Sequence, residues 1–275
     1  MVRSRKKFTS PRLTRRRRRV FVRKCLILGG TLAVLFGLSV AAFRVPWLQI
    51  ANVEVLGAST ISSEALSGMV QKGLEGNYAH LFPKSNNLLY PRETILKGVL
   101  QEYPRIANAD LSLSDINALR LVVSERSPYA LWCGEKRQSG EMGSCYFLDE
   151  SGYIFGKAPD FNGSVFFEFY GATSGTEVLG AQFLPPEEFK KLAAFADSLR
   201  GSTGMPKPNA VVVQKDNDVT IYLDNGSRIF VTRNADFAEA RVNLESVLDS
   251  SEFKERTPGK FDYIDLRFGN KVYFK

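Results

Sequence analysis

The sequence predicts an α+β protein with one membrane-spanning helix, a small β-α-α-β-β domain and a larger, mainly antiparallel β-domain with two helices. Three observations support this prediction. Residues 25–43 form one uncharged apolar run. Residues 48–126 show strand and helix patterns in the order β-α-α-β-β, and residues 127–275 contain short alternating segments interrupted by two amphipathic patterns.

The apolar run at residues 25–43 is long enough to cross a bilayer. Its nineteen residues cover about 28 Å as a helix, close to the thickness of the hydrocarbon layer. Residues 1–24 carry twelve Lys or Arg and no acidic residue, so the positive-inside rule places this basic tail in the cytoplasm. We therefore expect a single-pass protein of the cytoplasmic membrane, with the chain after Arg44 outside the cytoplasm.

The positive charge of the chain belongs to this tail. The whole sequence has 37 basic and 29 acidic residues, and without residues 1–24 the balance is 25 basic against 29 acidic. A basic arm beside a membrane span typically binds anionic lipid headgroups, whereas nucleic-acid binding requires a basic patch on a folded domain. Membrane lipids are therefore the expected partner of the tail, and nucleic acid is not expected to bind.

A cleaved signal peptide is the alternative reading of the N-terminal segment. Residues 18–23 loosely resemble a twin-arginine signal, and Val40 and Ala42 are small residues of the kind found before a cleavage site. The apolar run is longer than the 7–15 residues usual in a signal peptide. This length favours a retained anchor.

The block from residue 48 to 126 contains five predicted elements. They are a strand over 50–55, a helix from Ser62 or Ser63 to Gly73–Gly76, a helix from Pro91 to Pro104, and strands over 107–113 and 119–123 joined by a turn at 114–117. Residues 77–87 are expected to form a loop between the helices. His80, in that loop, is expected at a half-buried loop or turn position.

The block from residue 127 to 275 is predicted to be mostly β. Its elements are a helix from Pro186 to Gly201, strands over 210–213, 219–223 and 229–231, a helix capped by Asn234, and β structure from 261 to 274. Asn225-Gly226 gives the strongest short-range hairpin signal. The apolar faces of these elements are expected to form the core.

Cys133 and Cys145 bracket a polar insert, residues 134–144, between two apolar segments. This is the layout of a long-looped hairpin with a cysteine on each strand at its base. Disulfides persist outside the cytoplasm, and a bond closing so short a loop contributes up to about 3 kcal/mol. We expect a structural disulfide, with two free thiols as the alternative.

No pattern for catalysis or metal binding is present. The only histidine, His80, is far from Cys133 and Cys145, so neither a Cys–His nucleophile nor a zinc site is indicated. There is no phosphate-binding loop, no Gly-x-Ser-x-Gly and no Ser-x-x-Lys. We therefore expect a non-enzymatic protein without a cofactor or metal.

Five segments resemble the FtsQ family of bacterial division proteins, called DivIB in many Gram-positive bacteria. They occur in the family's order, at residues 53–57, 103–109, 124–132, 148–155 and 263–272. The resemblance implies a POTRA domain over 48–126 and an FtsQ-type β-domain over 127–275. The insert between the cysteines and the long loop at 77–87 depart from the family pattern.

The resemblance also implies a function and partners. Proteins of this family are divisome scaffolds at the division septum that link early and late division proteins. They bind FtsB and FtsL (DivIC) homologues, act with FtsW, FtsI and FtsK, and help control septal peptidoglycan synthesis. The implied mechanism is binding, without a chemical step.

The closing segment is the expected partner-binding site. A terminal strand is often an edge strand, and edge strands accept extended peptides. The residues implied by the resemblance are Asp265, Arg267, Phe268, Asn270, Val272 and Tyr273. Side-chain alternation lets only half of them face one side, so Phe268 and Tyr273 are expected to contribute unequally. The alternative is a paired strand that only completes the sheet.

A second surface and two other functions complete the expectations. Recruitment to the divisome is expected to involve the rim formed by Val53, Val55, Gly57 and Ser59. One alternative function is a POTRA-containing secretion or assembly component, although residues 127–275 are too short and too often interrupted by helices for a barrel. The other is a cell-wall enzyme secreted after cleavage, which would need catalytic residues that the sequence does not indicate.

Overall fold

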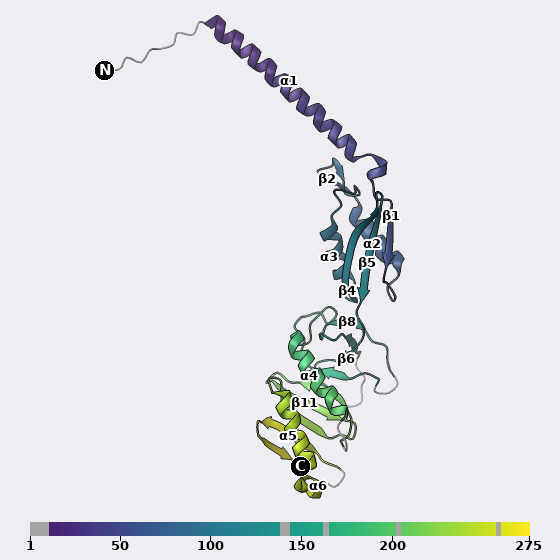
Figure 1. Cartoon of the computed structure of the whole chain (residues 1–275), viewed down its shortest axis with the longest axis vertical. Coiled ribbons are helices and arrows are strands. Elements are labelled where there is room, and N and C mark those ends of the chain that lie inside the picture. The colour runs from purple at the N-terminus through teal and green to yellow at the C-terminus, as the bar shows by residue number, and fades with distance from the viewer. Residues whose placement is uncertain (1–10, 138–143, 162–164, 202–204, 257–259) are drawn as a thin grey trace, which may run out of the picture. The chain divides into compact units, whose positions relative to one another are not determined.

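The computed structural model describes residues 11–137, 144–161, 165–201, 205–256 and 260–275 of the 275-residue chain (Figure 1). The chain divides into two compact units. The first unit contains residues 1–99 and 109–123, and the second contains residues 100–108 and 124–275.

The N-terminal segment is one continuous helix, α1 (Pro11–Phe43). It begins before the apolar run at residue 25, because the basic residues that precede this run are good helix formers. Its portion from Arg18 to Phe43 is long and apolar enough to cross a membrane, and none of it is buried in the protein. A short 3-10 helix, η1 (Pro46–Leu48), follows.

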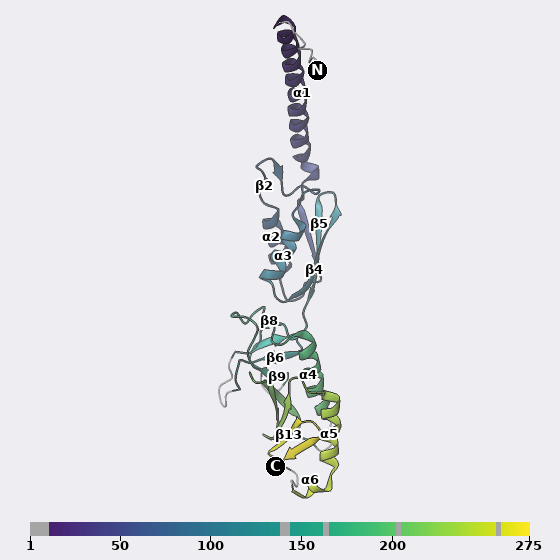
Figure 2. The same cartoon turned by 90° about the vertical axis from the view of Figure 1, so that its left-hand side faces the viewer.

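The first unit has a three-stranded sheet in the order β1-β5-β4. Its larger elements are β1 (Asn52–Leu56), α2 (Ser63–Leu74), α3 (Arg92–Glu102), β4 (Ile106–Asp115) and β5 (Ala118–Glu125). The predicted β-α-α-β-β order is therefore confirmed. β1 is parallel to β5, and both helices lie on the same side of the sheet (Figure 2). Their inward residues, such as Leu66 and Val99, are fully buried with Leu119 and Leu121 of β5.

One detail of α2 differs from the prediction. Gly73 lies inside α2 and does not end it. A Cβ atom there would lie 2.6 Å from the Ile95 side chain, so this glycine lets α3 approach α2. The expected cap is confirmed, since the Ser62 hydroxyl accepts a hydrogen bond from the Ala65 N–H.

The loop expected at residues 77–87 contains a small hairpin, β2 (Asn77–Tyr78) and β3 (Phe82–Pro83). Strands of two residues have too few side chains to give an alternating pattern, so the sequence does not indicate them. His80 is a turn residue, as expected, but it is exposed and not half-buried. It lies at the tip, where Ala79 and His80 both have positive φ.

The second unit is built on a nine-stranded sheet in the order β14-β13-β12-β11-β10-β9-β6-β7-β8. Its strands are β6 (Ala130–Trp132), β7 (Tyr146–Leu148), β8 (Ile154–Lys157), β9 (Glu168–Tyr170), β10 (Pro208–Val213), β11 (Asp218–Leu223), β12 (Arg228–Thr232), β13 (Tyr263–Phe268) and β14 (Lys271–Phe274). Three neighbouring pairs are parallel: β6 with β9, β9 with β10, and β12 with β13. The sheet is thus mixed, and only its other pairs match the expected antiparallel arrangement.

Helices cover one face of this sheet (Figure 2). They are α4 (Pro186–Ser198), α5 (Phe237–Asp249) and α6 (Ser251–Arg256), with the 3-10 turn η2 (Leu199–Gly201) after α4. The sequence predicted only two helices and missed the six-residue α6. The cap of α5 is Asp236, not Asn234, because the Asp236 carboxylate accepts hydrogen bonds from the backbone of Ala238 and Glu239.

Candidate functional site

The closing hairpin forms one edge of the nine-stranded sheet. Among the described residues, β14 has a strand neighbour, β13, on one side only. The turn between the two strands is Gly269-Asn270, with Gly269 at φ 61°. The Asn243 side chain of α5 donates a hydrogen bond of 3.0 Å to the Gly269 carbonyl, which holds this turn against the helical layer.

The hydrogen-bond pattern sets the direction of the β14 backbone. Tyr263 and Lys275 exchange both N–H···O bonds, at 3.3 and 3.1 Å. Antiparallel pairing alternates between bonded and non-bonded positions, so the N–H and C=O of Val272 point away from β13. The Val272 side chain packs against the core. Val272 can therefore offer backbone groups to another strand while its side chain stays inside.

Asp265 and Arg267 form a rigid charged cluster on the face opposite the helices. Arg267 donates from Nε and Nη2 to the two carboxylate oxygens of Asp265, at 2.9 and 2.6 Å, and from Nη1 to Asp218 of β11. The bonds to Asp265, with those to Asp218, raise the pKa of Arg267 above its usual range, although partial burial opposes them. Asp265 is buried, so this cluster positions β13 and leaves little of Asp265 for a partner.

Phe268 and Tyr273 form an exposed aromatic pair. Their ring centroids are 5.3 Å apart with an interplanar angle of 87°, and about half of each residue is exposed. Simple alternation suggested that only some of the candidate residues share a face. The register shift between Asp265 and Phe268 brings these two rings together. Asn270 is also exposed, in the adjoining turn.

Three further residues, Phe230, Arg228 and Asp218, lie around Arg267 without having been expected there. Phe230 of β12 lies under the guanidinium of Arg267 at 5.3 Å and near that of Arg228 at 5.6 Å, and Asp218 pairs with Arg267. Phe230 and Arg228 lie on β12, and Phe230 comes close to Arg267 on β13 because these two strands pair in parallel. No local sequence signal gives that pairing, so these residues could not be assigned to the site beforehand.

The residues expected to serve recruitment lie on and after β1. β1 is an edge strand of the first sheet, with Val53 and Val55 half-buried. Ser59 is exposed. Gly57 has φ 83°, and a Cβ atom there would lie 2.1 Å from the Val123 carbonyl oxygen. This glycine is therefore required by the local backbone, whatever else it does.

Cys133 and Cys145 form the disulfide that the sequence predicts. The bond lies beside the paired ends of β6 and β7, where Trp132 is opposite Tyr146. Residues 138–143 of the insert lie outside the described residues. Cys133 packs with Leu131 and Ala158 in a small apolar cluster, so the bond ties this end of the sheet together.

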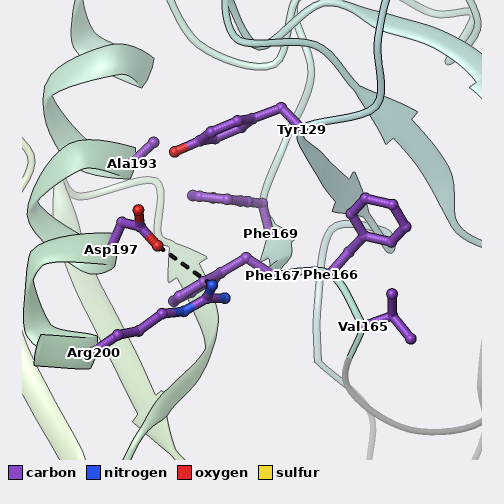
Figure 3. A pocket seen from close by; sticks show the side chains of 8 residues that line it. All are labelled: Tyr129, Val165, Phe166, Phe167, Phe169, Ala193, Asp197 and Arg200. Carbon is purple, nitrogen blue, oxygen red and sulfur yellow. Dashed lines mark ion pairs between the residues drawn. The ribbon is translucent and has the colours of Figure 1, made fainter.

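A recess of about 190 Å³ lies between α4 and the segment leading into β9 (Figure 3). It is lined by Tyr129, Val165, Phe166, Phe167, Phe169, Ala193, Asp197 and Arg200. Arg200 pairs with Asp197 at 3.4 Å and lies over the Phe167 ring. Burial, and then the negative charge of Asp197, raise the pKa of Tyr129, which keeps its phenol protonated. The recess is smaller than typical ligand pockets.

Metal binding has no structural support in the described part of the chain, where no three His, Cys, Asp or Glu side chains come together as a ligand group. His80 and the disulfide belong to separate units. The arrangement that the structure does present is an open sheet edge beside an exposed aromatic pair. Such an arrangement can bind another chain.

Comparison with protein families gives a match in the second unit. The model described as "Cell division protein FtsQ/DivIB, C-terminal" matches residues 136–267. In sequence order, the match covers the elements from β7 through most of β13. It does not include β6, β14 or any of the first unit, to which α1 belongs. Comparison with curated proteins gives no match.

Proposed function

The chain belongs to the FtsQ/DivIB family through its C-terminal domain, and from this premise we propose that it is a membrane-anchored scaffold of the divisome. The family is one of non-enzymatic cell-division proteins. In the proposal, α1 anchors the protein, the first unit is a POTRA domain that serves recruitment, and the second unit binds the FtsB and FtsL (DivIC) homologues. Through them it helps control septal synthesis by FtsW and FtsI.

The edge position of β14 carries the proposal. An extended segment of the FtsB homologue would add to β14 as a further strand, with main-chain hydrogen bonds giving affinity and side-chain contacts giving specificity. Val272 would supply backbone groups, and Phe268 and Tyr273 an apolar contact at the rim. The Asp265–Arg267 cluster would hold the edge in place.

The length and composition of α1 support its role as an anchor. Arg18–Phe43 is long and apolar enough to cross a membrane, and Phe43 at the end of α1 contacts Phe82 of the β2–β3 hairpin. Cleavage after Ala42 would remove nearly all of α1, including Phe36, which contacts Phe82. A retained anchor, with residues 1–24 in the cytoplasm, is the reading we propose.

A proline at position 272 tests strand addition directly. Val272→Pro removes an N–H that points away from β13, and proline is tolerated on edge strands at such positions. The full-length variant in detergent should bind the FtsB–FtsL pair of its own cell at least about tenfold more weakly, because a hydrogen bond is lost and its acceptor is left unpaired. Isothermal titration measures this change.

Val272→Ala is the matched control, since it trims the same side chain and keeps the N–H. It should retain most of the affinity. Equal binding by both variants would reject strand addition at β14. In living cells, a fluorescent protein fused before Met1 should collect at mid-cell during constriction, and a uniform membrane signal would contradict the role in division.

A further inference from the structure

The end of the first unit next to α1 carries four exposed large apolar side chains. They are Trp47, Tyr78, Leu88 and Ile116, with exposed fractions between 40% and 71%. We call these four residues the apolar collar. They come from η1, the β2–β3 hairpin, the segment before α3 and the β4–β5 turn, which are distant in sequence.

Asn87 joins three of these segments. Its backbone N–H donates to the Leu48 carbonyl at 2.9 Å, and its side-chain Nδ2 donates to the Ile116 carbonyl at 2.8 Å. Ile116 takes part in these hydrogen bonds, and Trp47 and Leu88 are the chain neighbours of Leu48 and Asn87, which also take part. These two bonds hold η1, the segment before α3 and the β4–β5 turn together at one end of the unit.

The β2–β3 hairpin, which contains Tyr78, lies beside the end of α1 (Figures 1 and 2). Phe82 of β3 makes edge contacts with Phe43 at 5.5 Å and with Phe36 at 6.4 Å. Phe36 lies seven residues inside the apolar helix, about 10 Å from Phe43 along its axis. If α1 spans the bilayer as proposed, a segment that contacts both rings lies level with the last two turns of the span.

Three backbone carbonyls at this end accept hydrogen bonds from side chains. Arg44 donates to the carbonyls of His80 and Leu81, at 3.2 and 3.1 Å. Asn86 donates to the Phe43 carbonyl at 3.0 Å, in the last turn of α1. Non-helical backbone at membrane depth is tolerated only when its polar groups are satisfied in this way.

We infer that the apolar collar lies in the headgroup layer of the outer leaflet and binds the same bilayer that α1 crosses. Trp and Tyr are the residues enriched at this depth, and the contact is continuous with α1. The nearby charges are mixed, with Arg44 and Lys84 basic and Asp115 acidic. Burial of apolar surface is thus the driving force, and zwitterionic lipid should suffice. The inference rests on the retained anchor of the proposed function.

Fluorescent labels on the full-length protein in phosphatidylcholine nanodiscs test the inference. Single cysteines are introduced as Leu88→Cys and Ile116→Cys in a Cys25→Ser background, and each is labelled with an environment-sensitive nitrobenzoxadiazole probe. Both labels should show blue-shifted emission and quenching by lipids with a nitroxide near the headgroup. Leu56→Cys is the matched control, because Leu56 is exposed at the opposite end of β1 and should be neither shifted nor quenched.

A label on native Cys25, in a separate sample, reports the span itself. The collar would be overturned, and the anchor left intact, if the Cys25 label were shielded from water while the Leu88 and Ile116 labels behaved like the Leu56 control. A Cys25 label exposed to water would overturn the anchor and the collar together. If the Leu88 and Ile116 labels were quenched only after anionic lipid is added, charge attraction and not apolar burial would drive the contact. This result would also overturn the inference.

Discussion

Arg267 donates two hydrogen bonds to Asp265, which precedes it by two residues on the same strand, at 2.9 and 2.6 Å. Residues at this spacing share one face of a strand. The pair is completed by Asp218 on β11, so it links strands on both sides of β12. Residues with a charged partner inside the protein are better suited to shape the edge than to contact a partner.

Arg267→Ala should therefore lower stability more than a surface substitution does. The substitution leaves the buried Asp265 carboxylate without its main hydrogen-bond donor, which should lower the free energy of unfolding by roughly 2–3 kcal/mol. Urea unfolding measures the loss. Arg228→Ala is the control, because it removes only an exposed cation–π contact with Phe230 and should cost under about 1 kcal/mol. Equal losses would show that the Asp265–Arg267 cluster does not hold the edge.

Reduction of the disulfide should destabilise the second unit. Cys133 and Cys145 are 12 positions apart, and a loop of that length corresponds to at most about 3 kcal/mol. The urea midpoint should fall on adding reductant, and the double variant with Cys133→Ser and Cys145→Ser should show the same lower midpoint without it. Cys25→Ser should keep the native response to reductant. A midpoint unaffected by reductant would mean that the cysteines are not bonded in solution.

Much of the fold follows from local sequence signals, and what was missed depends on long-range pairing. The apolar run, the Ser62 cap and the alternation in β4 and β5 are local, and each predicted its element. The parallel pairing of β12 with β13 joins segments separated by α5 and α6, so it leaves no local pattern.

The same division holds for the candidate site. The edge position of the closing segment was expected, because terminal strands often lie at a sheet edge, and β14 has one strand neighbour, β13, among the described residues. The contact between Phe268 and Tyr273 could not be predicted, since it depends on an irregular register. Phe230 and Asp218 lie in other strands and enter the site only through the sheet order.

Gly57→Ala should destabilise the first unit by more than about 1 kcal/mol. The residue has positive φ, and an added methyl group would meet the Val123 carbonyl. Gly68→Ala is the control, because Gly68 lies in α2 with open space around it and should gain about 0.5–1 kcal/mol. Thermal unfolding checks both changes. A stable Gly57→Ala protein that fails to reach mid-cell would instead assign this glycine to recruitment.

Asp149 should make stability sensitive to acid. Burial opposes its ionisation, but hydrogen bonds from Ser151, the Tyr153 N–H and Arg126 outweigh burial and lower the pKa of Asp149 below its usual value. This stabilisation is complete above the unfolded pKa of about 3.9 and is lost as pH falls through the lower folded pKa. Urea midpoints between pH 7 and pH 3 should fall less steeply for Asp149→Asn. If the urea midpoints of the native protein and of Asp149→Asn fell equally with pH, Asp149 would not be the source of the acid sensitivity.

The aromatic pair should contribute to partner binding, with Tyr273 the larger contributor. Tyr273 lies on the edge strand itself, whereas Phe268 ends the inner strand at the turn. Tyr273→Ala and Phe268→Ala should each weaken binding of the FtsB–FtsL pair. Because the rings are in contact, the double variant should lose less than the sum of the single losses. Val242→Ala, an exposed position on α5, should leave affinity unchanged. Additive losses, or equal losses at all three positions, would argue against a partner site centred on this pair.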